Sequence, residues 1–163
     1  MRIIGIDPGT AIMGFGLVDT RGGSATAVHY GALTTHQSLP TAERLLSLYN
    51  ELTEIVATFK PDAMAVEELF HNSNARTVMT VSQARGIILL VAAQAGMPIF
   101  EYTPPQVKSA VVGYGKATKE QVQTMVTTLL QLDSVPKPDD VADALAVAIC
   151  HAHSARIQTL AAV

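Results

Sequence analysis

The sequence has a single cysteine, Cys150, so no internal disulfide can form. Such sparing use of cysteine is typical of a reducing compartment, and we expect a cytoplasmic location with Cys150 as a small core hydrophobe. Long apolar runs are also missing. The longest, residues 86–93, is far shorter than the ~20 residues that cross a bilayer. The first apolar run contains an acid, Asp7, so we expect neither a signal peptide nor association with a membrane.

Charged residues are scarce, at 15% of the chain against 48% hydrophobic residues, a balance typical of an ordered globular protein. The length of 163 residues favours a single domain, residues 1–163, with a substantial core. Three consecutive strands are predicted first, at residues 1–7, 12–20 and 25–33, with a glycine-rich hairpin before the third. Helical periodicity then alternates with short apolar strands. We predict helices at residues 41–59, 74–95, 104–110, 118–131 and 139–154, and strands at 63–66 and 98–102. This order predicts an α/β fold: a five-stranded mixed sheet, three antiparallel strands then two parallel, flanked by helices on both faces.

The net charge of −3 at first argues against a nucleic-acid partner, but the charges are unevenly distributed. Residues 1–69 carry four basic and eight acidic side chains, and residues 120–163 carry two basic and five acidic ones. The middle segment, residues 70–119, has a net charge of +4, because only Glu101 opposes its five basic residues. These are Arg76, Arg85, Lys108, Lys116 and Lys119. The middle segment therefore suits an anionic ligand, and a chance cluster of solvated charges is the alternative.

Four carboxylates lie where strands end or a helix begins. Asp7 ends the first predicted strand and Glu67 follows the fourth, while Asp140 and Asp143 are three residues apart and share one helix face. An unpaired buried charge is expensive, so acids at such positions usually need a cation. Oxygen ligands from separate elements are those that Mg²⁺ prefers. Each acid also has a simpler reading: a turn residue, a loop acid, or a residue that stabilises a helix start.

Several motifs in this sequence resemble the RuvC family of Holliday-junction resolvases, within the RNase H-like superfamily. The resemblance covers about residues 2–153 and agrees in order and spacing. The motifs are Gly5-Ile6-Asp7-Pro8-Gly9-Thr10, Gly14-Phe15-Gly16, Val66-Glu67-Glu68-Leu69-Phe70, Gln83-Ala84-Arg85-Gly86, Gln106-Val107-Lys108 and Asp140-Val141-Ala142-Asp143-Ala144-Leu145-Ala146.

The resemblance implies an RNase H-like fold and a metal-dependent DNA endonuclease that makes paired, symmetric nicks in four-way junctions during recombination and repair. It implies that Asp7, Glu67, Asp140 and Asp143 are the catalytic acids and bind Mg²⁺, with two ions per site and Mn²⁺ as a substitute. It also implies that Lys108 and Lys119 lie near the scissile phosphate and that Phe70 stacks on a base. Arg76, Arg85 and Lys116 are further candidates for contact with DNA. The implied partners are a second copy of the chain and the RuvA–RuvB branch-migration complex.

Neighbouring acids test the register of this assignment. Glu68 adjoins Glu67 and Asp139 adjoins Asp140, and only one of each pair can face the site, since neighbours on a strand or helix point in different directions. The motif selects Glu67 and Asp140, which leaves Asp139 as a helix cap. His151 and His153 are expected at the end of the last helix, stabilised by its dipole, and not as metal ligands.

The helix predicted at residues 74–95 is the expected dimer contact. Its apolar stripe is broader than packing on one sheet requires, and Ala84, Gly86 and Ala92 would permit close approach of a partner. The alternative is that the whole stripe packs against the sheet.

Three rival functions remain open at this point. A sugar-kinase or actin-like phosphotransferase begins in the same way but normally needs two copies of the module, and this sequence has one. An inactive RNase H-like relative of the YqgF type would lack the pattern of basic residues and aromatic found here. A pure junction-binding module would use the acids only to stabilise helix ends, and would not cleave DNA.

Overall fold

Five strands form one mixed sheet in the order β3-β2-β1-β4-β5. The computed structural model describes residues 1–68 and 75–161, and side chains for residues 1–68 and 78–155. The strands are β1 (Arg2–Asp7), β2 (Ile12–Arg21), β3 (Ser24–Thr34), β4 (Ala63–Glu67) and β5 (Ile99–Tyr102). β1, β2 and β3 pair antiparallel, whereas β4 pairs parallel with both β1 and β5. This arrangement confirms the predicted sheet.

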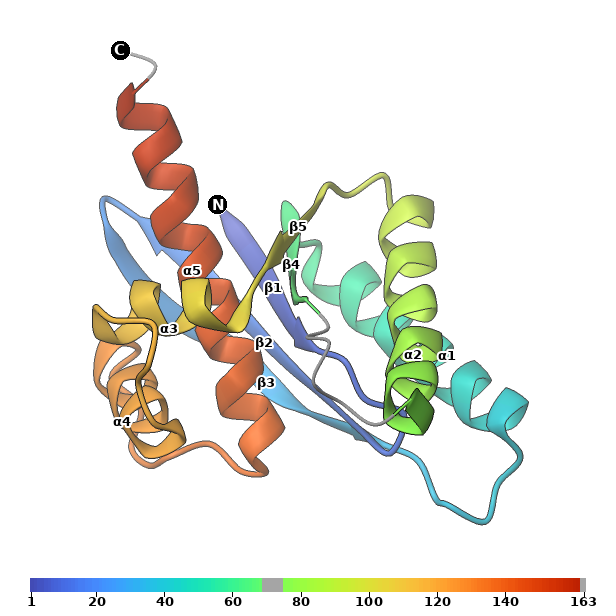
Figure 1. Cartoon of the computed structure of the whole chain (residues 1–163). Coiled ribbons are helices and arrows are strands. Elements are labelled where there is room, and N and C mark those ends of the chain that lie inside the picture. Colours follow the sequence, from blue (N-terminus) through green and yellow to red (C-terminus); the bar gives the residue numbers. More distant parts are fainter. Residues whose placement is uncertain (69–74, 162–163) are drawn as a thin grey trace.

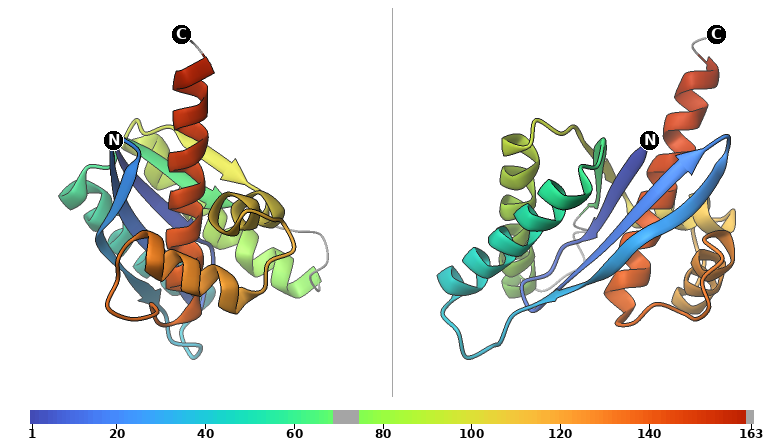
Figure 2. Two further views of the ribbon diagram at one scale, coloured as in Figure 1. Left: turned by 90° about the vertical axis from the view of Figure 1, so that its left-hand side faces the viewer. Right: turned by 180° about the vertical axis from the view of Figure 1, so that it is seen from behind.

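Helices cover both faces of the sheet (Figures 1 and 2). α1 (Thr41–Phe59) and α2 (Ala75–Gln94) lie on one face. On the other face lie α3 (Pro104–Val112), α4 (Lys119–Leu129) and α5 (Asp139–Ala161). None of the helices in the described part of the chain is long and apolar enough to span a membrane.

The last helix is longer than predicted, because α5 continues to Ala161 past the expected end at residue 154. No glycine or proline interrupts residues 155–161, so no local signal ends the helix earlier. The expectation that His151 lies at a helix end is therefore wrong. His151 is buried in the middle of α5, where its Nδ1 lies 2.8 Å from the hydroxyl of Tyr102 and its ring packs on Phe100.

Alternation along β1 and β4 decides which side chains face α5. Ile3 of β1 and Ala65 of β4 belong to the core on the α5 side, whereas Ile4, Ile6 and Val66 belong to the core on the α1–α2 side. Since successive side chains of a strand point to opposite faces, the acids that end these strands, Asp7 and Glu67, point to the α5 side. The pleat of the two strands therefore directs both acids toward one helix.

Glycines in β1 and β2 let α5 lie unusually close to the sheet. A Cβ atom on Gly5 would come within 2.1 Å of the carbonyl oxygen of Ala144, and one on Gly14 would come within 2.0 Å of the carbonyl oxygen of Asp140. Gly5 and Gly16 also pair directly across the two strands. Because no side chain intervenes, the backbone of α5 rests against the backbone of the sheet.

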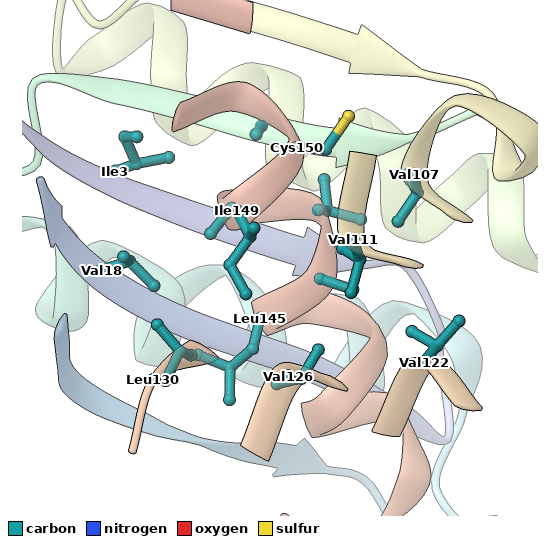
Figure 3. Packing of buried hydrophobic residues seen from close by; sticks show 14 of the residues in the cluster. Ile3, Val18, Val107, Val111, Val122, Val126, Leu130, Leu145, Ile149 and Cys150 are labelled. Carbon is teal, nitrogen blue, oxygen red and sulfur yellow. The ribbon is translucent and has the colours of Figure 1, made fainter. Parts of the chain in front are cut away.

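Apolar side chains from the sheet and from α3 and α4 close around the rest of α5 (Figure 3). Leu145 and Ile149 of α5 pack among residues of β1, β2, α3 and α4, and most of the helix from Val141 to His151 is buried. The labelled partners in Figure 3 include Ile3, Val18, Val107, Val111, Val122, Val126 and Leu130. α5 is therefore the central helix of this face.

We predict that Gly14→Ala lowers the stability of the protein by roughly 1–3 kcal/mol, the usual cost of overpacking. The new methyl group would meet the backbone of α5, which cannot rotate away. Thermal unfolding monitored by circular dichroism measures the effect, at roughly 2–4 °C per kcal/mol for a domain of this size. Gly31→Ala on β3 is the matched control, since its Cβ would meet only the Phe15 ring, at 3.2 Å, and that ring can shift. Equal losses in the two variants would contradict the backbone contact.

Candidate active site

Two of the predicted acids end adjacent parallel strands. Ile6 of β1 pairs with Val66 of β4, so Asp7 and Glu67, the next residue of each strand, leave the sheet side by side. Both are half-buried, whereas Glu68 is exposed. The strand register thus supports the choice of Glu67 over Glu68.

The other two acids come from the first turns of α5. Asp140 packs its backbone on Gly14, which itself pairs with Asp7 across β1 and β2. Asp143 is one turn further along the same helix face and is half-buried. The glycine contact therefore sets the distance between the acids of α5 and the acid of β1.

The acids shift one another's ionisation. Burial, reinforced by the charges of Glu67, Asp143 and Asp140, raises the pKa of Asp7 to about 8. Burial and then Asp143 raise the pKa of Glu67 to about 7, although Lys108 and Lys119 act in the opposite direction. The pKa of Asp143 is also raised, chiefly by burial, against the opposing effect of Lys119. The fold has therefore gathered more negative charge than its own cations neutralise.

A pocket of about 260 Å³ opens beside these acids and is lined by both signs of charge. Glu67 and Asp143 line it together with Lys108 of α3 and Lys119 of α4. The Lys119 ammonium lies 3.2 Å from Oδ2 of Asp143 and 3.4 Å from Oδ2 of Asp139. Acidic and basic groups thus face one small space, as a site for a phosphate ester and a cation requires.

The donor set fits a hard divalent cation, because it offers carboxylate oxygens from three separate elements and no sulfur or imidazole. In the described residues, however, no three Asp, Glu, His or Cys side chains close around a single point. The two observations agree, since the electrostatic coupling that shifts the pKa values acts over longer distances than ligation does. The side chains that would hold an ion are Asp7, Glu67, Asp140 and Asp143.

The other predicted DNA-contacting residues are not all gathered at this pocket. Arg85 of α2 forms an ion pair with Glu101 of β5, and Lys116 is exposed on the connection between α3 and α4. Phe70 and the side chain of Arg76 lie outside the described residues. The ion pair between Asp139 and Lys119 is not predicted from the sequence, because the two residues are far apart along the chain and no local pattern connects them.

A five-stranded mixed sheet with carboxylates at the ends of β1 and β4 and at the start of the last helix defines an RNase H-like nuclease. The family model for crossover junction endodeoxyribonuclease RuvC matches residues 3–151, so the chain belongs to the RuvC family. The predicted family and fold are thereby confirmed. The chain is an endonuclease that resolves four-way (Holliday) junctions in recombination and repair, and nucleases of this family are metal-dependent.

Individual relatives agree with this membership. The crossover junction endodeoxyribonuclease RuvC of Pelotomaculum thermopropionicum is 58% identical over 153 residues, 94% of this chain and 93% of the relative. That of Heliobacterium modesticaldum is 58% identical over 154 residues, 94% of this chain and 95% of the relative. Thermus thermophilus RuvC in complex with a Holliday junction substrate superposes with a TM-score of 0.93 at 39% identity, over 98% of this chain and 97% of the other.

We predict that Asp7→Asn stabilises the metal-free protein increasingly as the pH rises. The raised pKa means that the folded state favours the protonated carboxyl of Asp7. The contribution of this group to the free energy of unfolding is therefore fully present below pH ~4, and it is lost as the pH rises from the ordinary pKa of 3.8 to about 8. Asparagine cannot ionise and avoids that loss. Urea unfolding with a chelator at pH 5 and pH 8.5 measures the difference. The exposed Asp133→Asn is the control. A gain that is the same at both pH values would count against the assignment.

Proposed function

We propose that Asp7, Glu67, Asp140 and Asp143 bind two Mg²⁺ ions, with Mn²⁺ able to substitute, and form the centre that hydrolyses one strand of a four-way junction. The observation that carries this proposal is the meeting of four acids from three elements, with the pKa values of Asp7 and Glu67 raised to about 8 and 7. When bound, two such ions supply an activated water and a stabilised leaving oxygen. The single domain of residues 1–163 thus provides one complete set of acids.

The basic residues bind and orient the DNA backbone. Lys108 and Lys119 line the pocket with Glu67 and Asp143, so their ammonium groups would hold the scissile phosphate against the acids. Lys116 is exposed on the connection between them and would contact the backbone farther out, as would Arg76. Arg85 would have to break its ion pair with Glu101 in order to contact DNA, so we do not include it among the primary DNA contacts. Phe70 would stack on a base near the centre of the junction.

We predict that Asp7→Asn, Glu67→Gln, Asp140→Asn and Asp143→Asn each abolish cleavage but leave binding to a four-way junction intact. These substitutions remove ligands for the metal, whereas phosphate contacts by basic residues dominate affinity. Nicking of a labelled synthetic junction in Mg²⁺ or Mn²⁺, and gel-shift binding in Ca²⁺, measure the two properties separately.

Glu68→Gln is the matched control for this experiment, because its side chain is exposed next to Glu67 and should be dispensable. Wild-type cleavage by any of the four acid variants would remove that acid from the site. A protein that binds the junction but never cuts it in either metal would favour the junction-binding module instead.

We further propose a homodimer that forms through α2. In the part of this helix whose side chains the structure describes, residues 78–94, three large apolar side chains are exposed: Met79 at 68%, Leu90 at 47% and Leu89 at 36%. The prediction that Ala84 and Ala92 contact the partner is wrong, because both are buried in the core against α1 and the sheet. Gly86, by contrast, is exposed and has no atom within 4 Å of a Cβ position, so close approach of a partner at Gly86 stays open.

Symmetry supports the same proposal. Resolution needs two opposed strands to be cut, and one chain provides one set of acids, so a two-fold pair of chains is the simplest solution for paired, symmetric nicks. The T. thermophilus relative was captured with a Holliday junction substrate, which supports four-way junction DNA as the ligand of this chain. By family resemblance, the dimer would work beside the RuvA–RuvB branch-migration complex.

We predict that Met79→Glu combined with Leu90→Glu converts the protein to a monomer, since both charges would be buried at a two-fold interface. Sedimentation velocity at micromolar concentration measures the state. Leu46→Glu on α1, where Leu46 is 57% exposed, is the matched control and should stay dimeric. A wild-type protein that is monomeric at this concentration, yet makes paired nicks, would exclude the dimer.

A further inference from the structure

Asp139 lies at the start of α5 and was expected only to cap that helix. In the structure its carboxylate lies between two lysines. Oδ1 is 3.1 Å from the ammonium of Lys137, and Oδ2 is 3.4 Å from the ammonium of Lys119. Asp139 does not line the pocket beside the acids, whereas Lys119 does. The ion pair with Lys119 is therefore the contact that connects Asp139 to the pocket.

Lys119 is shared between two carboxylates of different function. Its ammonium lies 3.2 Å from Oδ2 of Asp143, which we assign to the metal, and 3.4 Å from Oδ2 of Asp139, which we do not. A carboxylate that is bound to a divalent cation has its charge largely neutralised and attracts an ammonium less strongly. Asp139 keeps its full charge in that state, because it stands outside the set of ligands.

We propose that Asp139 is a positioning residue that holds the Lys119 ammonium beside the reacting phosphate when Asp143 is engaged with the metal. This inference rests on the roles proposed above for Lys119 and Asp143. The Lys119 side chain is 49% exposed on a flexible four-carbon stem, so without a fixed partner its ammonium would disperse into solvent. Lys137 contributes by holding the other oxygen of Asp139.

Asp139→Asn tests this directly, because asparagine removes the charge but still serves at a helix start. We expect the single-turnover cleavage of a synthetic four-way junction in Mg²⁺ to slow roughly two- to fivefold, the size of one partly exposed ion pair. The Kd for the junction in Ca²⁺ should change less than about twofold. In a Lys119→Met background the same substitution should have no further effect, and Asp139→Glu should restore part of the rate.

A measurement on the metal-free protein separates positioning from catalysis. Metal-free Asp143→Asn removes the charge that otherwise holds Lys119. In that background the ε-methylene carbon of Lys119, followed by NMR relaxation, should become more mobile when Asp139→Asn is added. Asp133→Asn is the matched control: Asp133 is an exposed aspartate in the α4–α5 connection and forms no ion pair within the described residues. It should change neither the mobility nor the rate.

The outcomes distinguish failure of the positioning role of Asp139 from failure of the proposed active site. The positioning role is overturned if Asp139→Asn leaves either the cleavage rate or the mobility of the Lys119 side chain unchanged. It is also overturned if Asp139→Asn slows cleavage equally with and without Lys119. In either case the proposed site still stands if Asp143→Asn is inactive and Lys119→Met is slow. If Asp143→Asn and Lys119→Met cleave at the wild-type rate, the proposed site itself fails. If Asp139→Asn lowers the thermal stability and the cleavage rate equally in the wild-type and Lys119→Met backgrounds, Asp139 acts only by stabilising α5.

Discussion

The contact between the backbone of α5 and the backbone of β1 and β2 is the constraint on which the active site depends. Gly5 and Gly14 leave no side chain between the helix and the sheet, and the carbonyl oxygens of Ala144 and Asp140 occupy the places of the missing Cβ atoms. At this short distance the charges of Asp140 and Asp143 on α5 act on Asp7, the acid that ends β1. The site is thus positioned by the absence of atoms at two strand residues as much as by the acids themselves.

The second constraint is electrostatic: the close packing of α5 on the sheet also brings carboxylates of like charge together. Folding brings Asp7, Glu67, Asp140 and Asp143 together in half-buried surroundings. The raised pKa values of Asp7, Glu67 and Asp143 show that this is unfavourable for their charged forms. Lys119 and Lys108 offset only part of the charge. The protein therefore accepts a local loss of stability to hold these carboxylates together, which is the arrangement that the proposed metal site requires. Sites of this kind are where optimal packing and function conflict.

Much of the fold could be predicted from the sequence, because its signals are local. Short continuous apolar runs marked β1 and β4, and helical periodicity marked α1. The position of Asp7 and Glu67 at the ends of those two strands indicated the site. The end of α5 could not be predicted in this way, since no cap or breaker ends the helix near residue 154. The burial of Ala84 and Ala92 could not be predicted either, because the apolar stripe on α2 is broad and does not indicate which of its sides packs against the sheet. The ion pair from Asp139 to Lys119 depends on how α4 packs beside α5, which is a tertiary property.

α5 differs from an ordinary surface helix because it is buried around most of its circumference between Val141 and His151. A helix without a polar face gains little from docking on one neighbour alone, and it needs the sheet together with α3 and α4 to leave water. In the order of folding, the helix that carries Asp140 and Asp143 is therefore secured only when the surrounding elements have assembled. A chain whose core is not yet complete would therefore lack the proposed centre, even though its sequence already holds all four acids.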